Sequence, residues 1–207
     1  MRIAILTEGS GEFKSFPVLV SKIAPSLPKR TRVTRILRIN VPPDAPPAQF
    51  VAACRAPLKV AASVATLAVI LIDREQQEAC PGQIATLLEQ EFGRKGTNLA
   101  VRVALKDRTF ENWLIADLGA LQSQPARFAV TAAISRCVEP DKADRCDAEK
   151  IIKKAAANGQ YDKITDAERI STKLDIESAA RNSRSFRHFL HILGHSSYRS
   201  QCRLPSP

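Results

Sequence analysis

Leu67-Ala-Val-Ile-Leu-Ile72 is a run of six apolar residues, and the acids Asp73 and Glu75 follow it directly. A strand without any polar residue is buried on both faces, as in the centre of a parallel sheet that is covered by helices. A second apolar run, Ile3-Ala-Ile-Leu-Thr7, also ends in an acid, Glu8. Because ligand sites in open parallel sheets lie beyond the carboxyl ends of the strands, we expect these three carboxylates to meet at one edge.

Strand and helix patterns alternate over the first two thirds of the chain, which predicts an α/β fold with a mainly parallel sheet of about four strands flanked by helices. The residues expected in the strands are 2–7, 32–39, 67–72 and 99–105. The residues expected in the helices of this part are those from the turn at 8–12 to about 23, 48–64, 81–92 and a segment from about 110. Arginines interrupt the 32–39 strand and indicate an exposed edge. We expect Pro17 in the first turn of its helix, and Pro57 to break or kink the 48–64 helix.

The character of the sequence changes after about residue 118. No later segment resembles a central strand, while residues 148–157, 166–181 and 185–193 have helical periodicity or composition. We therefore expect a core over residues 1–118 and a mostly helical C-terminal extension over residues 119–207, packed on that core.

The chain is strongly basic, with 31 Lys and Arg against 21 Asp and Glu and a net charge of +10 over 207 residues. Such a charge attracts polyanions, chiefly nucleic acid. The best candidates for phosphate contacts lie near the C-terminus, although a solvated surface explains them equally well. These residues are Arg181, Arg184, Arg187 and Arg199. No apolar run reaches the roughly 18 to 20 residues of a membrane-spanning helix, so we expect a cytoplasmic protein.

Cysteine and histidine spacings do not favour a metal site. Five cysteines are an odd number without a C-x-x-C pair, so free thiols are expected, with a Cys137–Cys146 disulfide or zinc half-site as the alternative. His188, His191 and His195 would share a helix face only if Gly194 did not end that helix.

The strand-end acids instead favour magnesium, which prefers oxygen ligands and takes a few protein carboxylates while leaving positions for water and phosphate. Glu8, Asp73 and Glu75 supply such ligands. The neighbouring loop Gly9-Ser-Gly11 lacks the Lys-Ser/Thr of a P-loop and is flanked by acids, so we expect no ATPase activity from this chain itself.

Two of these motifs resemble a known fold. Thr7-Glu-Gly9 followed by Glu12, and Asp73-Arg-Glu75 after an apolar strand, are similar to the Rossmann-like TOPRIM fold of topoisomerases, primases and overcoming-lysogenization-defect nucleases. That signature is a Glu-Gly turn and an Asp-x-Asp pair. Glu75 replaces the second Asp, which keeps the carboxylate but lengthens its reach.

The resemblance extends over nearly the whole chain. The stretches Phe110-Glu-Asn-Trp-Leu-Ile-Ala-Asp117, Tyr161-Asp-Lys163 and 185–193 are similar to an uncharacterised TOPRIM-like family of about this length. Members of that family are often encoded beside ABC-type or AAA ATPases in bacterial defence loci. The resemblance therefore implies a nuclease that acts on DNA or RNA, without a membrane partner, and works with a separately encoded ATPase in defence against phage.

The resemblance also implies roles for individual residues in a reaction dependent on Mg²⁺ or Mn²⁺. Glu12 would be a second-metal ligand or general base, Glu111 an additional acid, and Lys163 a cation that stabilises charge on the phosphate. Glu12 and Glu111 each lie in a first helical turn, where the helix dipole also favours an acid, and Lys163 is equally explained as a solvated lysine. The implied catalytic residues are Glu8, Glu12, Asp73, Glu75, Glu111 and Lys163, with Glu8, Asp73, Glu75 and Glu12 as metal ligands. A non-catalytic TOPRIM-like scaffold that binds an ATPase or nucleic acid is the alternative.

Overall fold

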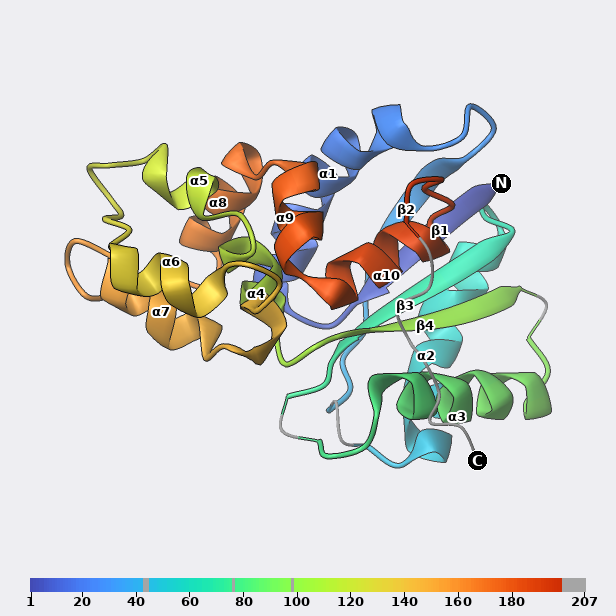
Figure 1. Cartoon of the computed structure of the whole chain (residues 1–207). Coiled ribbons are helices and arrows are strands. Elements are labelled where there is room, and N and C mark those ends of the chain that lie inside the picture. Colours follow the sequence, from blue (N-terminus) through green and yellow to red (C-terminus); the bar gives the residue numbers. More distant parts are fainter. Residues whose placement is uncertain (43–44, 76, 98, 199–207) are drawn as a thin grey trace.

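The structure is a computed structural model that describes residues 1–42, 45–75, 77–97 and 99–198 (Figure 1). Its sheet has four strands, all parallel, in the order β2-β1-β3-β4. The strands are β1 (Arg2–Thr7), β2 (Arg32–Arg38), β3 (Leu67–Asp73) and β4 (Ala100–Lys106). The α/β fold class is confirmed, with β2 at an edge and the apolar run of β3 in the interior of the sheet.

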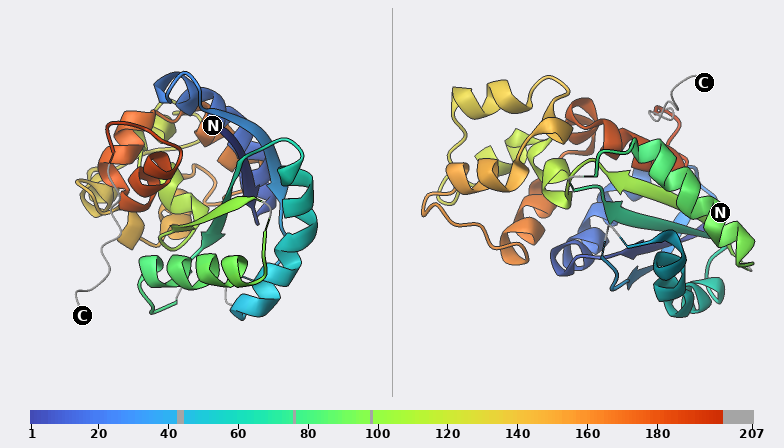
Figure 2. Two further views of the ribbon diagram at one scale, coloured as in Figure 1. Left: turned by 90° about the vertical axis from the view of Figure 1, so that its right-hand side faces the viewer. Right: turned by 90° about the horizontal axis from the view of Figure 1, so that it is seen from below.

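Two hydrophobic clusters lie on opposite faces of this sheet, because side chains alternate along each strand. Ile3 and Ile5 of β1 point into one cluster, and Ala4 and Leu6 point into the other. The Ala4 side is covered by α2 (Pro47–Ala62) and α3 (Pro81–Arg94). The Ile3 side is covered by α1 (Ser10–Ile23) and α10 (Arg184–Ile192), as Figures 1 and 2 show.

The remaining helices are short and belong to the same cluster as the Ile3 face. They are α4 (Phe110–Ile115), α5 (Leu118–Gln122), α6 (Ala132–Val138), α7 (Ala148–Ala155), α8 (Thr165–Lys173) and α9 (Ile176–Asn182). Figure 1 shows the strands running from the N-terminus toward the group formed by α4 to α8. Most of the helical extension therefore lies beyond the carboxyl edge of the sheet, whereas α10 packs on the Ile3 face.

Trp113 is the centre of this shared core. Its indole stacks on Phe189 and meets Phe186 edge to face, with both ring centroids 5.1 Å away. Its ring N–H donates to Ser185 Oγ at 2.7 Å, so the one polar atom of the buried ring is satisfied. This packing fixes α4 of the core against α10 of the extension.

The prolines of α1 and α2 differ from expectation in where they lie and in whether they end a helix. Pro17 lies in the middle of α1 rather than in its first turn, and α2 runs without interruption through Pro57. The burial of Cys54, Leu58 and Ala61 on one face of α2 explains why packing outweighs the lost backbone hydrogen bond there. Of the predicted break or kink, the break is wrong, because α2 is one continuous helix.

The predicted 166–181 helix is also wrong, because α8 and α9 are separate helices. Asp175 caps α9 by accepting a hydrogen bond from the Ser178 N–H at 2.8 Å, and its own N–H donates to Asp117 at 2.7 Å. Helices α5 and α6 were not predicted at all. No helix in the described part of the chain is long and apolar enough to cross a membrane.

Candidate active site at the carboxyl edge of the sheet

Glu8 and Asp73 lie together, as the strand pattern predicts. Glu8 follows β1 directly, Asp73 is the last residue of β3, and the two strands are neighbours in the sheet. The backbone N–H of Asp73 donates a hydrogen bond to the Glu8 carboxylate. Two acids that are 65 positions apart in the sequence therefore share one corner of the sheet.

Glu12 joins them from the first turn of α1, which begins just after Gly9. Its side chain is almost fully buried, and its carboxylate accepts a hydrogen bond from the Thr7 hydroxyl at the end of β1. Interaction with the helix dipole does not by itself explain this burial, because the dipole also stabilises acids that are exposed. Glu12 is therefore part of the cluster.

A lysine that the sequence did not reveal occupies the centre of the three acids. Lys106 ends β4, directly opposite Asp73 in the register of β3 and β4, and is fully buried. Its ammonium lies 3.0 Å from Asp73 Oδ1 and 3.8 Å from Glu8 Oε1, and it hydrogen bonds to Glu12. We refer to Glu8, Glu12, Asp73 and Lys106 as the carboxylate–lysine cluster.

Burial dominates the protonation of this cluster. Removal from water raises the pKa of Glu8 to about 7 and that of Glu12 to about 8, although the Lys106 charge opposes both shifts. The carboxylates raise the pKa of Lys106, so it remains an ammonium ion despite its burial. One cation cannot neutralise three anions, and the cluster therefore holds exchangeable protons near neutral pH, as acid–base catalysis requires.

The donor atoms of the cluster suit a hard cation, since the three acids offer only carboxylate oxygens. Asp73 Oδ1 is buried and makes no hydrogen bond, although it lies within ion-pair distance of Lys106. No group of three or more Asp, Glu, His or Cys side chains is arranged as a metal site among the residues that the structure describes. The oxygen donors thus fit Mg²⁺ chemically, but they are arranged around an ammonium ion.

Glu75 lies outside the cluster, at an exposed position with a φ of 50°. Its N–H donates to the Arg108 carbonyl at 2.8 Å, and both residues line a shallow hollow. A left-handed backbone conformation redirects the chain immediately after the strand. The structure therefore places the second acid of the Asp73-x-Glu75 motif at the rim of the site.

Glu111 approaches the site from α4, and Lys163 approaches it from the extension. The nearly buried carboxylate of Glu111 accepts a hydrogen bond from the Tyr161 hydroxyl at 3.3 Å. Lys163 pairs with Glu149 at 2.8 Å, while its side chain remains 61% exposed. The Lys163 carbonyl lies against Gly11, where an added Cβ would be 2.0 Å from that oxygen. The Tyr161–Lys163 segment, one of those that resemble the TOPRIM-like family, therefore packs on the first turn of α1.

The four predicted arginines differ in their contacts and in their exposure. Arg184 pairs with Asp107 at 3.3 Å, next to the carboxylate–lysine cluster, and is about half exposed. Arg187 donates to Asp141 and to the Ala180 carbonyl, which ties α10 to α9. Arg181 is exposed, and Arg199 lies outside the described residues. Arg184 is the member of this set that lies beside the candidate site.

The described cysteines are free, which confirms the expectation for Cys54, Cys80, Cys137 and Cys146. Cys202 lies outside the described part of the chain. The three histidines do not share one helix, because α10 contains His188 and His191 but ends at Ile192, before His195, and Gly194 has a φ of 92°.

Comparisons with known proteins identify a family but no characterised relative. No curated protein and no solved structure matches the chain. The model of the family described as Domain of unknown function (DUF4276) matches residues 7–194, a span that runs from the end of β1 to just after α10. The chain therefore belongs to the DUF4276 family.

Proposed function

We propose that this protein is a nuclease dependent on Mg²⁺ or Mn²⁺ that cleaves phosphodiester bonds in nucleic acid. The observation that carries the proposal is the convergence of Glu8, Glu12 and Asp73 from three separate segments at the carboxyl edge of a parallel sheet. The net charge of +10 supports a polyanionic substrate. The TOPRIM resemblance of the Glu8-Gly9 and Asp73-x-Glu75 motifs supports the same chemistry.

Glu8 and Asp73 would hold the metal, with Glu75 at the rim. When bound, the metal supplies activation of water and neutralisation of charge on the phosphate. Lys106 is fully buried, so we assign it to positioning the carboxylates rather than to contact with the substrate. Arg184 and Lys163 are exposed cations beside the site, and they are suited to binding the phosphate backbone.

The broader biological role rests on the resemblance alone. We propose that the chain acts in the cytoplasm as the effector of an anti-phage defence system, together with a separately encoded ABC-type or AAA ATPase. Co-purification with an ATPase encoded beside its own gene, compared with an unrelated ATPase, tests this part of the proposal.

A non-catalytic scaffold is the second candidate, and the position of Lys106 favours it. An ammonium ion bonded to Glu12 and within 3.0 Å of Asp73 stabilises the carboxylates without a metal. Such a protein would use its basic surface to bind nucleic acid or an ATPase without cleaving a substrate.

Metal binding and cleavage together separate the two functions. Mn²⁺ binding is measured by calorimetry, and cleavage is measured on labelled single- and double-stranded DNA and RNA. A nuclease binds Mn²⁺ and loses both binding and cleavage in Glu8→Gln and Asp73→Asn, while the exposed Glu177→Gln control retains them. Cleavage that survives both substitutions would refute the site. Absence of Mn²⁺ binding in the wild type, with binding gained in Lys106→Met, would support the scaffold.

A further inference from the structure

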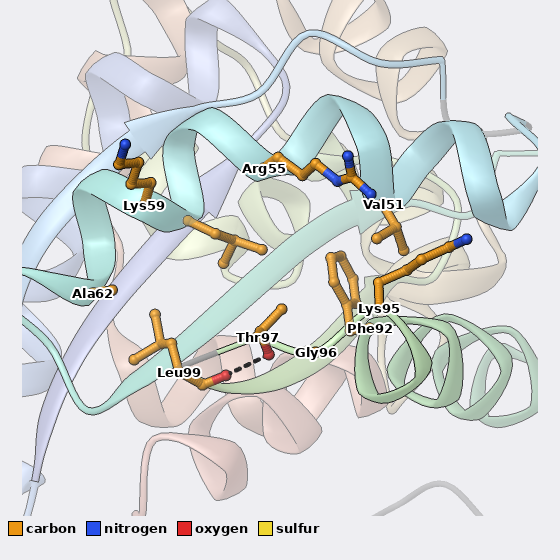
Figure 3. Close-up of a pocket in the computed structure, with 10 residues that line it drawn as sticks. Val51, Arg55, Lys59, Ala62, Phe92, Lys95, Gly96, Thr97 and Leu99 are labelled. Atoms are coloured by element: carbon orange, nitrogen blue, oxygen red, sulfur yellow. Dashed lines mark hydrogen bonds between the residues drawn. The ribbon is translucent and has the colours of Figure 1, made fainter.

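A second hollow lies at the opposite edge of the sheet, between α2 and α3, with a volume of about 380 Å³ (Figure 3). Leu99 in its wall precedes β4, whereas Lys106 ends that strand. Six residues of the strand lie between the two, and the seven steps from Leu99 to Lys106 span roughly 20 Å at about 3.3 Å per residue. The hollow is therefore distinct from the carboxylate–lysine cluster, and ligand binding there would not depend on the proposed nuclease or scaffold function.

The wall of the hollow combines an apolar floor with a cationic rim. In Figure 3, Val51 of α2 and Phe92 of α3 face one another across it, and Leu99 closes one end. Among the described residues, those with charge in the lining are all basic, and none is acidic. They are Arg55, Lys59 and Lys95.

Helix ends explain part of this charge but not all of it. Lys59 lies in the last turn of α2 and Lys95 caps α3, where cations interact favourably with the helix dipole. Arg55 lies in the middle of α2, and no ion pair in the described residues involves it or Lys59. Lys95 makes a long contact of 3.9 Å with Glu91. The apolar surface is therefore surrounded by cations that form few ion pairs with acidic side chains, and it is open to a ligand.

We propose that this hollow binds a small organic anion with an apolar body and a phosphate or carboxylate group. Its volume falls in the range of small-molecule pockets, which are typically about 300–1,000 Å³ and combine an apolar lining with a few polar groups. The apolar body would lie on Val51, Leu58 and Phe92. The Arg55 guanidinium would bind the anionic group, since its planar donors match both phosphate and carboxylate.

The test uses the fluorescent probe 8-anilinonaphthalene-1-sulfonate, which has the proposed combination of an aromatic body and an anionic group. The probe is titrated into the wild-type protein, into the Arg55→Glu/Lys59→Glu variant and into the Lys150→Glu/Lys154→Glu variant. The control pair is exposed on α7 and reverses the same amount of charge. Both variants change exposed residues, so circular dichroism should show that each remains folded.

The proposal predicts that probe binding weakens about tenfold or more in the Arg55/Lys59 variant and changes less than about twofold in the control. Competition with adenosine monophosphate and with octanoate then distinguishes the two ligand sources. Displacement by the nucleotide indicates an organic phosphate, and displacement by octanoate indicates a carboxylate. Equal binding to all three proteins, equal weakening in both variants, or displacement by neither competitor would overturn the proposal.

Discussion

Substituting Lys106 with methionine removes the buried cation and keeps a side chain of similar length. In the wild type this ammonium is fully buried and faces Glu8, Glu12 and Asp73. Removing one partner of a buried ion pair typically costs about 3–5 kcal/mol, because the remaining charge is left without compensation. We expect a loss in this range at pH 8, where Glu8 is mostly ionised and Glu12 is about half ionised.

The same substitution should cost less at pH 5. Burial raises the pKa of Glu8 to about 7 and of Glu12 to about 8, so at pH 5 both carry protons and neither pairs with Lys106 as an anion. The contact of Lys106 with Asp73 at 3.0 Å remains, and since the Asp73 side chain is partly solvated, losing it costs about 1–2 kcal/mol. The destabilisation should therefore be about 2 kcal/mol larger at pH 8 than at pH 5.

Urea unfolding at the two pH values, followed by circular dichroism, measures this difference. The matched control is Lys153→Met, because Lys153 is 49% exposed and pairs with Glu149 on the same helix. Its loss should be below about 1 kcal/mol at both pH values. Combining Lys106→Met with Glu12→Gln should restore part of the stability at pH 8. Equal destabilisation at the two pH values, or a loss no larger than that of the control, would refute the electrostatic account of the cluster.

Two further predictions concern the cluster and its surroundings. Because the folded-state pKa values of Glu8 and Glu12 lie above the ordinary value of 4.5, the folded protein binds more protons, and the free energy of unfolding should fall as pH rises from about 5 to 8. Thermal melts across this range should show the decline, and Glu12→Gln should reduce its slope; an unchanged slope would contradict the assignment. Gly11→Ala should destabilise the protein by about 1–3 kcal/mol in urea unfolding, since the new Cβ meets the Lys163 carbonyl. Gly93→Ala, a helical site with no neighbouring atom within 4 Å, should be neutral or stabilising, and similar losses at both glycines would show that the close approach is unimportant.

The sheet and half of the candidate site follow from local sequence patterns. Apolar runs locate the strands, and the rule that ligand sites lie at the carboxyl edge of a parallel sheet brings Glu8 to Asp73. Lys106 could not be found in this way, because a lysine at the end of a strand is normally exposed. Its burial depends on the register that sets it opposite Asp73, and on Glu12 reaching the same point from α1.

The errors in the helices have a tertiary cause. Nothing between residues 166 and 181 marks a helix end by glycine or proline, and the separation of α8 from α9 depends on the Asp175 N–H donating to Asp117 in another part of the chain. Pro57 is the opposite case, since a local breaker is overridden by the buried face of α2. The spacing of apolar residues identifies a helix by its buried face. The ends of the helices in this protein depend instead on contacts between residues that are far apart in the sequence.

Protonation of the buried acids affects how strongly the protein attracts nucleic acid. The formal charge of +10 counts Glu8, Glu12 and Asp73 as fully ionised, but the raised pKa values of Glu8 and Glu12 keep part of that negative charge protonated near neutral pH. The cluster therefore repels an approaching phosphate backbone less than three free carboxylates would. Entry of a divalent cation needs ionised ligands and hence the release of these protons, so metal and protons compete for the same oxygens. A nuclease with a buried lysine at this point would have to open its site to bind metal, whereas a scaffold would keep the site closed, and the response of Mn²⁺ binding to Lys106→Met separates the two.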